Sequence, residues 1–215
     1  MKHFATVTFF VVAAMAPALR AQSWEVGAGA GGSFFTSQSV QSAGVSGKTG
    51  FQNAFALSAW AGHSSASMFA GELRYDYENA GLKLSSGGTS ASFAGHTNAI
   101  HYDFIMNLTS SEASIRPFLA VGGGVKLYTG SGAETSVQPL QNLAFLTQTN
   151  QVEPVISIGG GVKFNLSRST QLRLDIHDYL SPFPQNVIAP APGSKISGWV
   201  QDFSVMAGLS FALGN

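Results

Sequence analysis

Apolar and polar residues alternate along most of this chain with a period of two, rather than the 3.6 of an amphipathic helix. In the segment 199–213, apolar side chains occupy the odd positions from Phe203 to Leu213, while Asp202 and Ser204 begin the other phase. Alternate side chains lie on opposite faces of a strand, so the pattern predicts β-strands with one apolar and one polar face. Eight such segments are found, at residues 24–35, 50–61, 68–80, 93–108, 114–128, 152–166, 171–180 and 199–213.

The charged residues of these segments fall almost entirely in the polar phase. Of 14 charged residues, only Asp178 shares the phase of the large apolar side chains. The other 13 are Glu25, Glu72, Arg74, Asp76, Glu78, Asp103, Arg116, Lys126, Glu153, Lys163, Arg173, Asp175 and Asp202. Such a sheet has two possible orientations. Its apolar face points inward in a soluble, lipocalin-type barrel and outward to lipid in a transmembrane barrel with a polar lumen.

The lengths of the connections favour the transmembrane orientation. They run 14, 6, 12, 5, 23, 4 and 18 residues, so long and short connections alternate throughout. Membrane barrels show this asymmetry, and a tilted strand needs only about 9–11 residues to cross the hydrocarbon core. We therefore expect an all-β fold, an eight-stranded antiparallel up-and-down transmembrane β-barrel with a polar lumen and short periplasmic turns. Its long extracellular loops would be residues 36–49, 81–92, 129–151 and 181–198.

The start of the chain has the composition of a secretory signal peptide. A basic start precedes an apolar stretch from Phe4 to Ala16, and small residues follow it. A membrane-spanning helix needs about 20 apolar residues, so this stretch is too short to be one. We expect residues 1–21 to be a signal peptide and residues 22–215 to form the barrel domain. Cleavage after Ala18 and an amphipathic N-terminal helix are the alternatives.

The composition narrows the possible functions. Charged residues make up 10% of the chain and the formal net charge is zero, so no basic excess is present to bind nucleic acid. Cysteine is absent, which excludes disulfides, a thiolate zinc site and a cysteine nucleophile. The glycine triplets at 122–124 and 159–161 lack the Gly-Lys-Ser/Thr ending of a phosphate loop. We expect no cofactor and no nucleic-acid partner.

Two glycine-rich segments repeat one pattern at an offset of 37 residues. Pro117–Leu127 reads PFLAVGGGVKL and Pro154–Phe164 reads PVISIGGGVKF. With Arg116 before it, the first segment is similar to the "RPY-x-G-x-G-x-G" strand of the small eight-stranded outer-membrane barrels of Gram-negative bacteria, the outer-membrane protein A/X/W group. The resemblance implies an outer-membrane location, lipid and lipopolysaccharide as neighbours, and a monomer. Members usually end on an aromatic residue, whereas four residues follow Phe211 here.

An eight-stranded barrel has an interior that side chains just fill. Here the predicted lumen holds eight acids, five bases and two histidines, His101 and His177, which share the polar phase of their segments. Buried charges need partners, so we expect a polar network that plugs the pore, with a narrow conduit as the alternative. Adjacent segments suggest ion pairs of Arg116 with Asp103, and of Arg173 with either Glu153 or Asp202.

The histidines also raise metal and enzyme hypotheses. His101 with Asp103 and Asp175 with His177 each share one face, but their segments are not neighbours, so these residues could meet only across the lumen. Some barrels of this kind modify lipid A with a serine and a histidine near the outer rim. The cluster His63-Ser64-Ser65 falls in a periplasmic turn instead, and His96, near the outer rim, has no adjacent serine and acid. We expect neither a metal site nor catalysis.

Aromatic residues near the segment ends fit a membrane interface. The predicted girdle consists of Trp24, Phe164, Trp199, Phe203 and Phe211. The long loops are almost uncharged, and the last holds four of the eight prolines, which predicts a stiff, extended segment. The leading hypothesis is a structural or surface-interaction barrel that contacts surface ligands through its loops. The alternatives are a narrow channel or conduit for small molecules, a lipid A-modifying enzyme and a soluble lipocalin-like binder.

Overall fold

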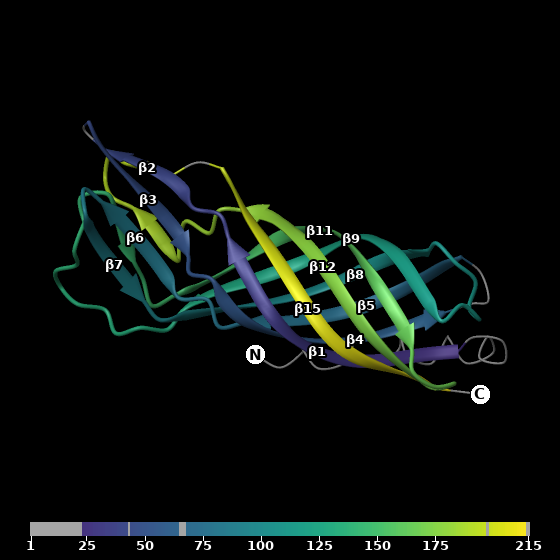
Figure 1. The fold of residues 1–215 in the computed structure, drawn as a ribbon. Helices are drawn as coiled ribbons and strands as arrows, with labels where there is room; N and C mark the ends of the chain where they lie inside the picture. Colours follow the sequence, from purple (N-terminus) through teal and green to yellow (C-terminus); the bar gives the residue numbers. More distant parts are fainter. Residues whose placement is uncertain (1–22, 43, 65–67, 197, 214–215) are drawn as a thin grey trace, which may run out of the picture.

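The computed structural model describes residues 23–42, 44–64, 68–196 and 198–213. Eight long strands form a closed antiparallel barrel in the order β1-β15-β12-β11-β9-β8-β5-β4 (Figure 1). They are β1 (Ser23–Phe35), β4 (Ala54–Ser64), β5 (Phe69–Glu78), β8 (Gly95–Asn107), β9 (Ile115–Gly130), β11 (Asn150–Asn165), β12 (Thr170–Pro182) and β15 (Trp199–Leu213). Each strand pairs with the next, and β15 closes onto β1. The prediction of an eight-stranded antiparallel barrel is confirmed.

The bounds of the eight barrel strands agree closely with the predicted segments, except for the second segment. The segment predicted at 50–61 is strand β4, which begins at Ala54, because residues up to Phe51 belong to another strand. The predicted signal peptide lies outside the described residues, so it stays a prediction. Within the described ranges, no helix is long and apolar enough to cross a membrane.

Large apolar side chains cover the outside of the barrel. The exposed set includes Leu73, Tyr75, Ile100, Tyr102, Phe104, Leu119, Val121, Ile156, Ile158, Leu174, Ile176, Val205 and Leu209. Phe104 is 66% exposed and Ile176 is 51% exposed. A continuous apolar surface of this extent is characteristic of contact with lipid or protein rather than water. The soluble lipocalin-type alternative requires these side chains inside, so it is wrong.

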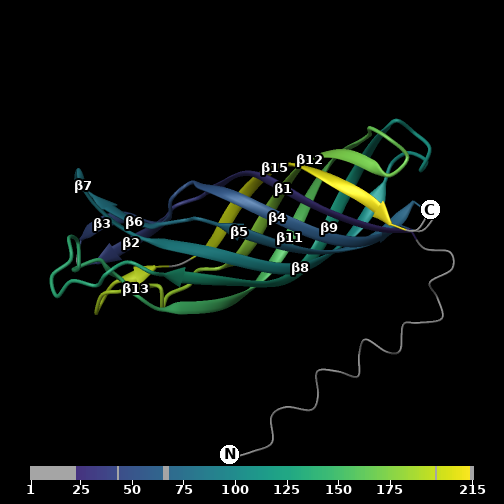
Figure 2. The same cartoon turned by 90° about the horizontal axis from the view of Figure 1, so that it is seen from below.

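The four long connections fold together at one end of the barrel, opposite the start of β1 and the end of β15 (Figures 1 and 2). We call them the cap, meaning the described residues of 36–53, 79–94, 131–149 and 183–198. Five of its strands form one sheet in the order β14-β2-β3-β6-β7, and two more pair with each other. The strands are β2 (Gln38–Ser42), β3 (Val45–Phe51), β6 (Leu82–Ser86), β7 (Thr89–Phe93), β10 (Ala144–Leu146), β13 (Ile188–Pro190) and β14 (Lys195–Ile196).

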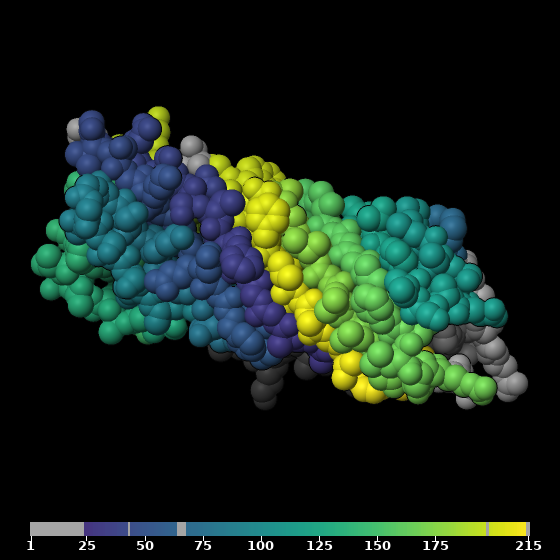
Figure 3. Space-filling model, viewed as in Figure 1, coloured from purple at the N-terminus to yellow at the C-terminus, as the bar shows by residue number. Residues whose placement is uncertain are grey.

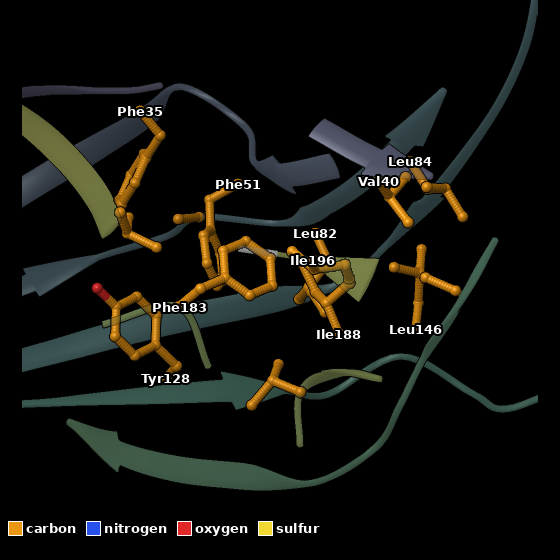
Figure 4. Close-up of a cluster of buried hydrophobic side chains, with 14 of the residues drawn as sticks. Phe35, Val40, Phe51, Leu82, Leu84, Tyr128, Leu146, Phe183, Ile188 and Ile196 are labelled. Carbon is orange, nitrogen blue, oxygen red and sulfur yellow. The ribbon is translucent and has the colours of Figure 1, made fainter. Parts of the chain in front are cut away.

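The cap encloses an apolar core, which the adjoining ends of β1, β9 and β15 help to form (Figure 4). Phe51 is fully buried, with its ring centroid 5.5 Å from that of Phe35 and 4.9 Å from that of Tyr128. The other buried members are Val40, Ala80, Leu82, Leu84, Leu143, Ala144, Leu146, Phe183, Val187, Ile188, Ile196 and Val200. Figure 3 shows the cap continuing directly from the barrel wall. The cap is therefore a packed extension of the barrel.

The last long connection differs from the stiff, extended segment that its prolines predict. The carbonyl of Pro184 accepts hydrogen bonds from the N–H groups of Val187 and Ile188, so the chain turns there. Burial of Val187 and Ile188 in the cap core stabilises this turn. Packing against the other connections, which no local pattern reveals, overrides the extended preference of the prolines.

Candidate functional site

The structure buries nearly all predicted lumen residues inside the barrel. The buried set is Glu25, Glu72, Arg74, Asp76, Glu78, His101, Asp103, Arg116, Lys126, Lys163, Arg173, Asp175, His177 and Asp202. Glu153 is half-buried and accepts a hydrogen bond from the side chain of Gln151. Glycines leave room for these side chains, since a Cβ atom at Gly122 would lie 2.2 Å from Oδ1 of Asp103.

Two arginines on opposite walls hold the centre of the lumen together. Arg74 on β5 donates to both oxygens of Asp175 at 3.2 and 3.1 Å, and its Nε donates to Oδ1 of Asp76 at 3.2 Å. Arg173 on β12 donates to Oδ2 of Asp175 at 2.6 Å and through both terminal nitrogens to Glu72. Bidentate, charge-assisted bonds of this kind are the strongest that side chains form. They tie β5 to β12 across the lumen.

The partners that the sequence suggested for Arg116 and Arg173 are wrong. Arg173 binds Glu72 and Asp175, because Asp202 lies opposite Tyr179, six residues farther along β12, or about 20 Å away. Glu153 is likewise at the cap end of its strand. Asp103 accepts from His101 instead of Arg116. Within the described part of the chain, Arg116 has no carboxylate at ion-pair distance. Among the described residues, the paired arginines and lysines find their carboxylates on their own strand or across the barrel.

His101 bridges two carboxylates in the middle of the barrel. Its Nδ1 lies 3.0 Å from Oδ1 of Asp103, and its Nε2 lies 3.0 Å from Oδ2 of Asp76. Both ring nitrogens therefore face carboxylates, and both can donate only when the imidazole carries two protons. The hydroxyl of Tyr179 also donates to Oδ2 of Asp76, at 3.0 Å. His101 thus acts as a further cation of the network.

The two histidine–carboxylate pairs of the metal hypothesis do meet across the lumen. The ring centroids of His101 and His177 are 6.3 Å apart. However, Nη1 of Arg74 lies 3.2 Å from Nε2 of His177, and Oγ of Ser157 lies 3.1 Å from its Nδ1. The Arg74 guanidinium already places a positive charge beside His177, and this charge would repel a metal ion. No group of three or more potential ligands in the described ranges could hold a metal.

Further layers fill the lumen above and below this centre. Toward the cap, Nζ of Lys126 lies 2.6 Å from Asp202 and 2.7 Å from Glu78. Toward the short turns, Nζ of Lys163 lies 2.7 Å from Glu25. Ion pairs and the side chains around them therefore occupy the lumen at three levels, which leaves a filled interior rather than an open pore.

Aromatic side chains, which were not among the predicted lumen residues, complete this filling. The Arg173 guanidinium lies 4.8 Å from the Trp60 ring centroid and 4.6 Å from that of Phe118. A signal was present for Phe118, Tyr128 and Tyr179, because they share the strand phase of the charged residues or of His177. Phe118 follows Arg116 by two residues, Tyr128 follows Lys126, and Tyr179 follows His177.

One face of the five-stranded cap sheet packs against the cap core, and its other face points outward. Lys48 lies opposite Ser39 on β2 and Ser85 on β6, and Ser85 lies opposite Ser90 on β7. Residues that are directly opposite share a face. This outer face of the cap sheet consists of Ser39, Gln41, Ser46, Lys48, Lys83, Ser85, Ser90, Ser92 and Lys195. Among these side chains, three are basic and none is acidic.

The histidines of the enzyme hypothesis lie at opposite ends of the barrel. His63 is on β4 near Trp24, with ring centroids 6.3 Å apart, at the end away from the cap; Ser65 lies outside the described residues. His96 lies next to the Tyr77 ring, and it lines one surface pocket together with Ser92 and Ser131. No hydrogen bond recorded among the described residues joins His96 to a serine or a carboxylate. The structure therefore shows no activated nucleophile there.

The structure is similar to solved bacterial outer-membrane barrels. Neisserial surface protein A aligns with a TM-score of 0.54 at 12% identity, covering 87% of this chain and 96% of that one. AlkL, an outer membrane protein in lipid bilayers, aligns with a TM-score of 0.51 at 14% identity and covers 90% of each chain. Ail of Yersinia pestis, solved with the heparin analogue sucrose octasulfate, aligns with a TM-score of 0.50 at 8% identity over 89% and 99%.

The chain has the fold of the small eight-stranded outer-membrane β-barrels. No protein-family model matches it, and no curated protein matches it in sequence. The fold implied by the resemblance of the Arg116 strand is confirmed. In this outer-membrane barrel fold, the predicted girdle residues lie on the exterior. Trp24 and Phe211 are exposed at the end with the short turns, Trp199 and Phe203 are exposed near the cap, and Phe164 is half-buried.

Proposed function

We propose that this chain is an outer-membrane surface protein of a Gram-negative bacterium, which contacts anionic saccharides through the outer face of the cap sheet. The observation that carries the proposal is the composition of that face, with three lysines, hydroxyl and amide groups, and no carboxylate. The role is binding without catalysis. A filled lumen supports it, because the barrel then acts as a rigid support for the cap.

The orientation follows from the asymmetry of the connections. Membrane barrels of this fold carry short turns on the periplasmic side and longer connections outside. All four long connections of this chain form the cap. The cap would therefore stand in the extracellular medium, and the exposed apolar band of the barrel would face lipid. The predicted girdle residues would lie at the two membrane interfaces.

The spacing of the lysines suits a polymer with repeated negative charges. Lys48 lies opposite Ser85, so Lys83 is its diagonal neighbour, about 7–8 Å away. Lys195 lies two strands and two residues from Lys48, about 12 Å away. Serine hydroxyls and the Gln41 amide between them can bond to sugar oxygens. That Ail, with the same fold, has been solved with a sulfated saccharide supports this ligand class.

The second candidate function is a narrow channel or conduit. The lumen observations disfavour it, since Lys126, His101 and Lys163 mark three successive levels of buried, paired charge. Moving a solute through would break ion pairs at each level, and unpaired buried charges are costly.

Replacing Lys48, Lys83 and Lys195 together by glutamine should weaken binding of sucrose octasulfate about tenfold. Each exposed ion pair contributes about 0.2–1 kcal/mol, and glutamine keeps the length of the side chain while removing its charge. Binding should be measured by calorimetry on the protein refolded in detergent, at two salt concentrations, because screening should weaken it further.

The matched control is Arg168→Gln, which removes one exposed charge in the short connection between β11 and β12, at the other end of the barrel. It should leave binding unchanged, whereas Lys48→Gln alone should weaken it measurably. Undiminished binding by the triple variant, with the cap folded, would contradict the proposal.

A further inference from the structure

A pocket of about 470 Å³ lies on the outside of the molecule, where β5 and β8 meet the cap. Three aromatic residues are among those that line it, Tyr77, Phe93 and His96, and Phe93 also packs against the cap core. The Tyr77 and His96 ring centroids are 5.9 Å apart, with 31° between the ring planes. The side chains of Gln52 and Asn79 add amide groups. The exposed lining of the pocket is therefore mainly polar, with the paired Tyr77 and His96 rings beside hydrogen-bonding groups.

The lining has the chemistry that recognises an uncharged sugar ring. The apolar C–H face of a hexose packs against aromatic rings, and amides both donate and accept hydrogen bonds, as hydroxyl groups require. The described residues that line the pocket include no lysine, arginine, aspartate or glutamate. The volume exceeds that of one hexose ring, and a few polar groups in a largely preformed concavity are typical of ligand sites.

The level of the pocket relative to the apolar band points to a membrane ligand. Outward side chains along β5 run from Leu73 and Tyr75, which are exposed and apolar or aromatic, to Tyr77 and Asn79 at the pocket. The hydroxyl of Tyr75 donates to Oδ1 of Asn98 at 2.7 Å, which marks the change to polar surface. The pocket therefore begins where the lipid-facing band ends, at the height of lipid headgroups.

From this position and lining, we propose that the pocket binds an uncharged hexose in the headgroup of a glycolipid of the outer leaflet. The inference rests on the proposed orientation, with the cap outside the cell. It concerns a partner in the protein's own membrane, whereas the cap sheet would contact saccharides beyond it. The glycolipid would anchor the cap to the membrane surface, because the pocket joins β5 and β8 to cap residues such as Ser92.

The test measures which lipids the full barrel retains. The protein is refolded in nanodiscs that contain lipopolysaccharide and phosphatidylglycerol, extracted in mild detergent, and examined by native mass spectrometry. We expect lipopolysaccharide to be retained preferentially. Tyr77→Ala and Gln52→Ala should each lower its retention at least fivefold, and Tyr77→Ala should leave binding of sucrose octasulfate unchanged.

Two controls match these variants. Tyr75→Ala removes an exposed ring two residues away on β5, and Gln148→Ala removes an exposed amide elsewhere in the cap. Both should retain lipopolysaccharide as the unaltered protein does, and a shift in gel mobility on boiling should verify that each variant is folded. The proposal would be overturned if all four variants retained lipopolysaccharide equally. It would also be overturned if the protein retained phosphatidylglycerol as well as it retained lipopolysaccharide. So would a retained lipopolysaccharide that has lost acyl chains, because the pocket would then be catalytic.

Discussion

Replacing Arg173 by methionine should lower the free energy of unfolding of the refolded barrel by about 3–5 kcal/mol. The guanidinium is fully buried and binds both Glu72 and Asp175. Methionine fills part of the space between Trp60 and Phe118. It leaves the buried carboxylates of Glu72 and Asp175 each with one partner fewer. Breaking a buried ion pair on one side is costly for this reason. Urea unfolding in lipid vesicles, followed by tryptophan fluorescence, gives the free energy.

Two comparisons separate this effect from a general loss of charge. Arg168→Met removes an exposed arginine and should change the free energy of unfolding by less than about 0.5 kcal/mol. Adding Glu72→Gln to Arg173→Met should recover part of the loss, since it removes one of the unpaired charges. If Arg173→Met were as stable as the unaltered barrel, the network would not be what holds β5 and β12 together.

Replacing Phe51 by alanine should destabilise the cap by about 3–5 kcal/mol while leaving the barrel closed. Phe51 is fully buried and packs against Phe35 and Tyr128, so its removal leaves a cavity at the junction of cap and barrel. Hydrogen exchange by mass spectrometry should show faster exchange in β2, β3 and β6 and unchanged exchange in the eight barrel strands.

The control on the same strand is Val45→Ala, because Val45 is 43% exposed and lies outside the cap core. It should leave exchange in the cap nearly unchanged. Cap exchange that stays slow in the Phe51 variant would contradict a cap held by its apolar core. Opening of the barrel strands in that variant would show instead that cap and barrel fold as one unit.

The alternation of side chains predicted the barrel strands because burial on one face imposes a period of two on every strand. Asp178, the one charge in the apolar phase, is on the exterior and accepts a hydrogen bond at 2.7 Å from the side chain of Gln201 on the neighbouring strand. Lumen partners could not be predicted, because Arg74 and Asp175 belong to strands that meet only across the closed barrel. Their contact depends on the stagger of all eight strands, which no single segment encodes.

The cap escaped prediction for a different reason. Val40 and Leu146 come from separate long connections, each with only a few apolar residues among serine, glycine and glutamine. No connection alone buries enough apolar surface to show a periodic pattern. The core forms only because the barrel brings four such connections to the same end. No single connection therefore carries a sequence pattern that predicts it. The outer face of the cap sheet could not be recognised without the register that places Lys48 beside Lys83.

Recordings from the protein in a planar lipid bilayer test the central claim most directly, that this is a closed barrel which acts through its cap. The protein would first be shown to be folded by a change in gel mobility between unboiled and boiled samples. We predict no steady single-channel openings at moderate voltage, because paired charges fill the lumen from Lys163 to Lys126. Steady openings of a defined conductance in the unaltered protein would contradict the claim and make the barrel a channel.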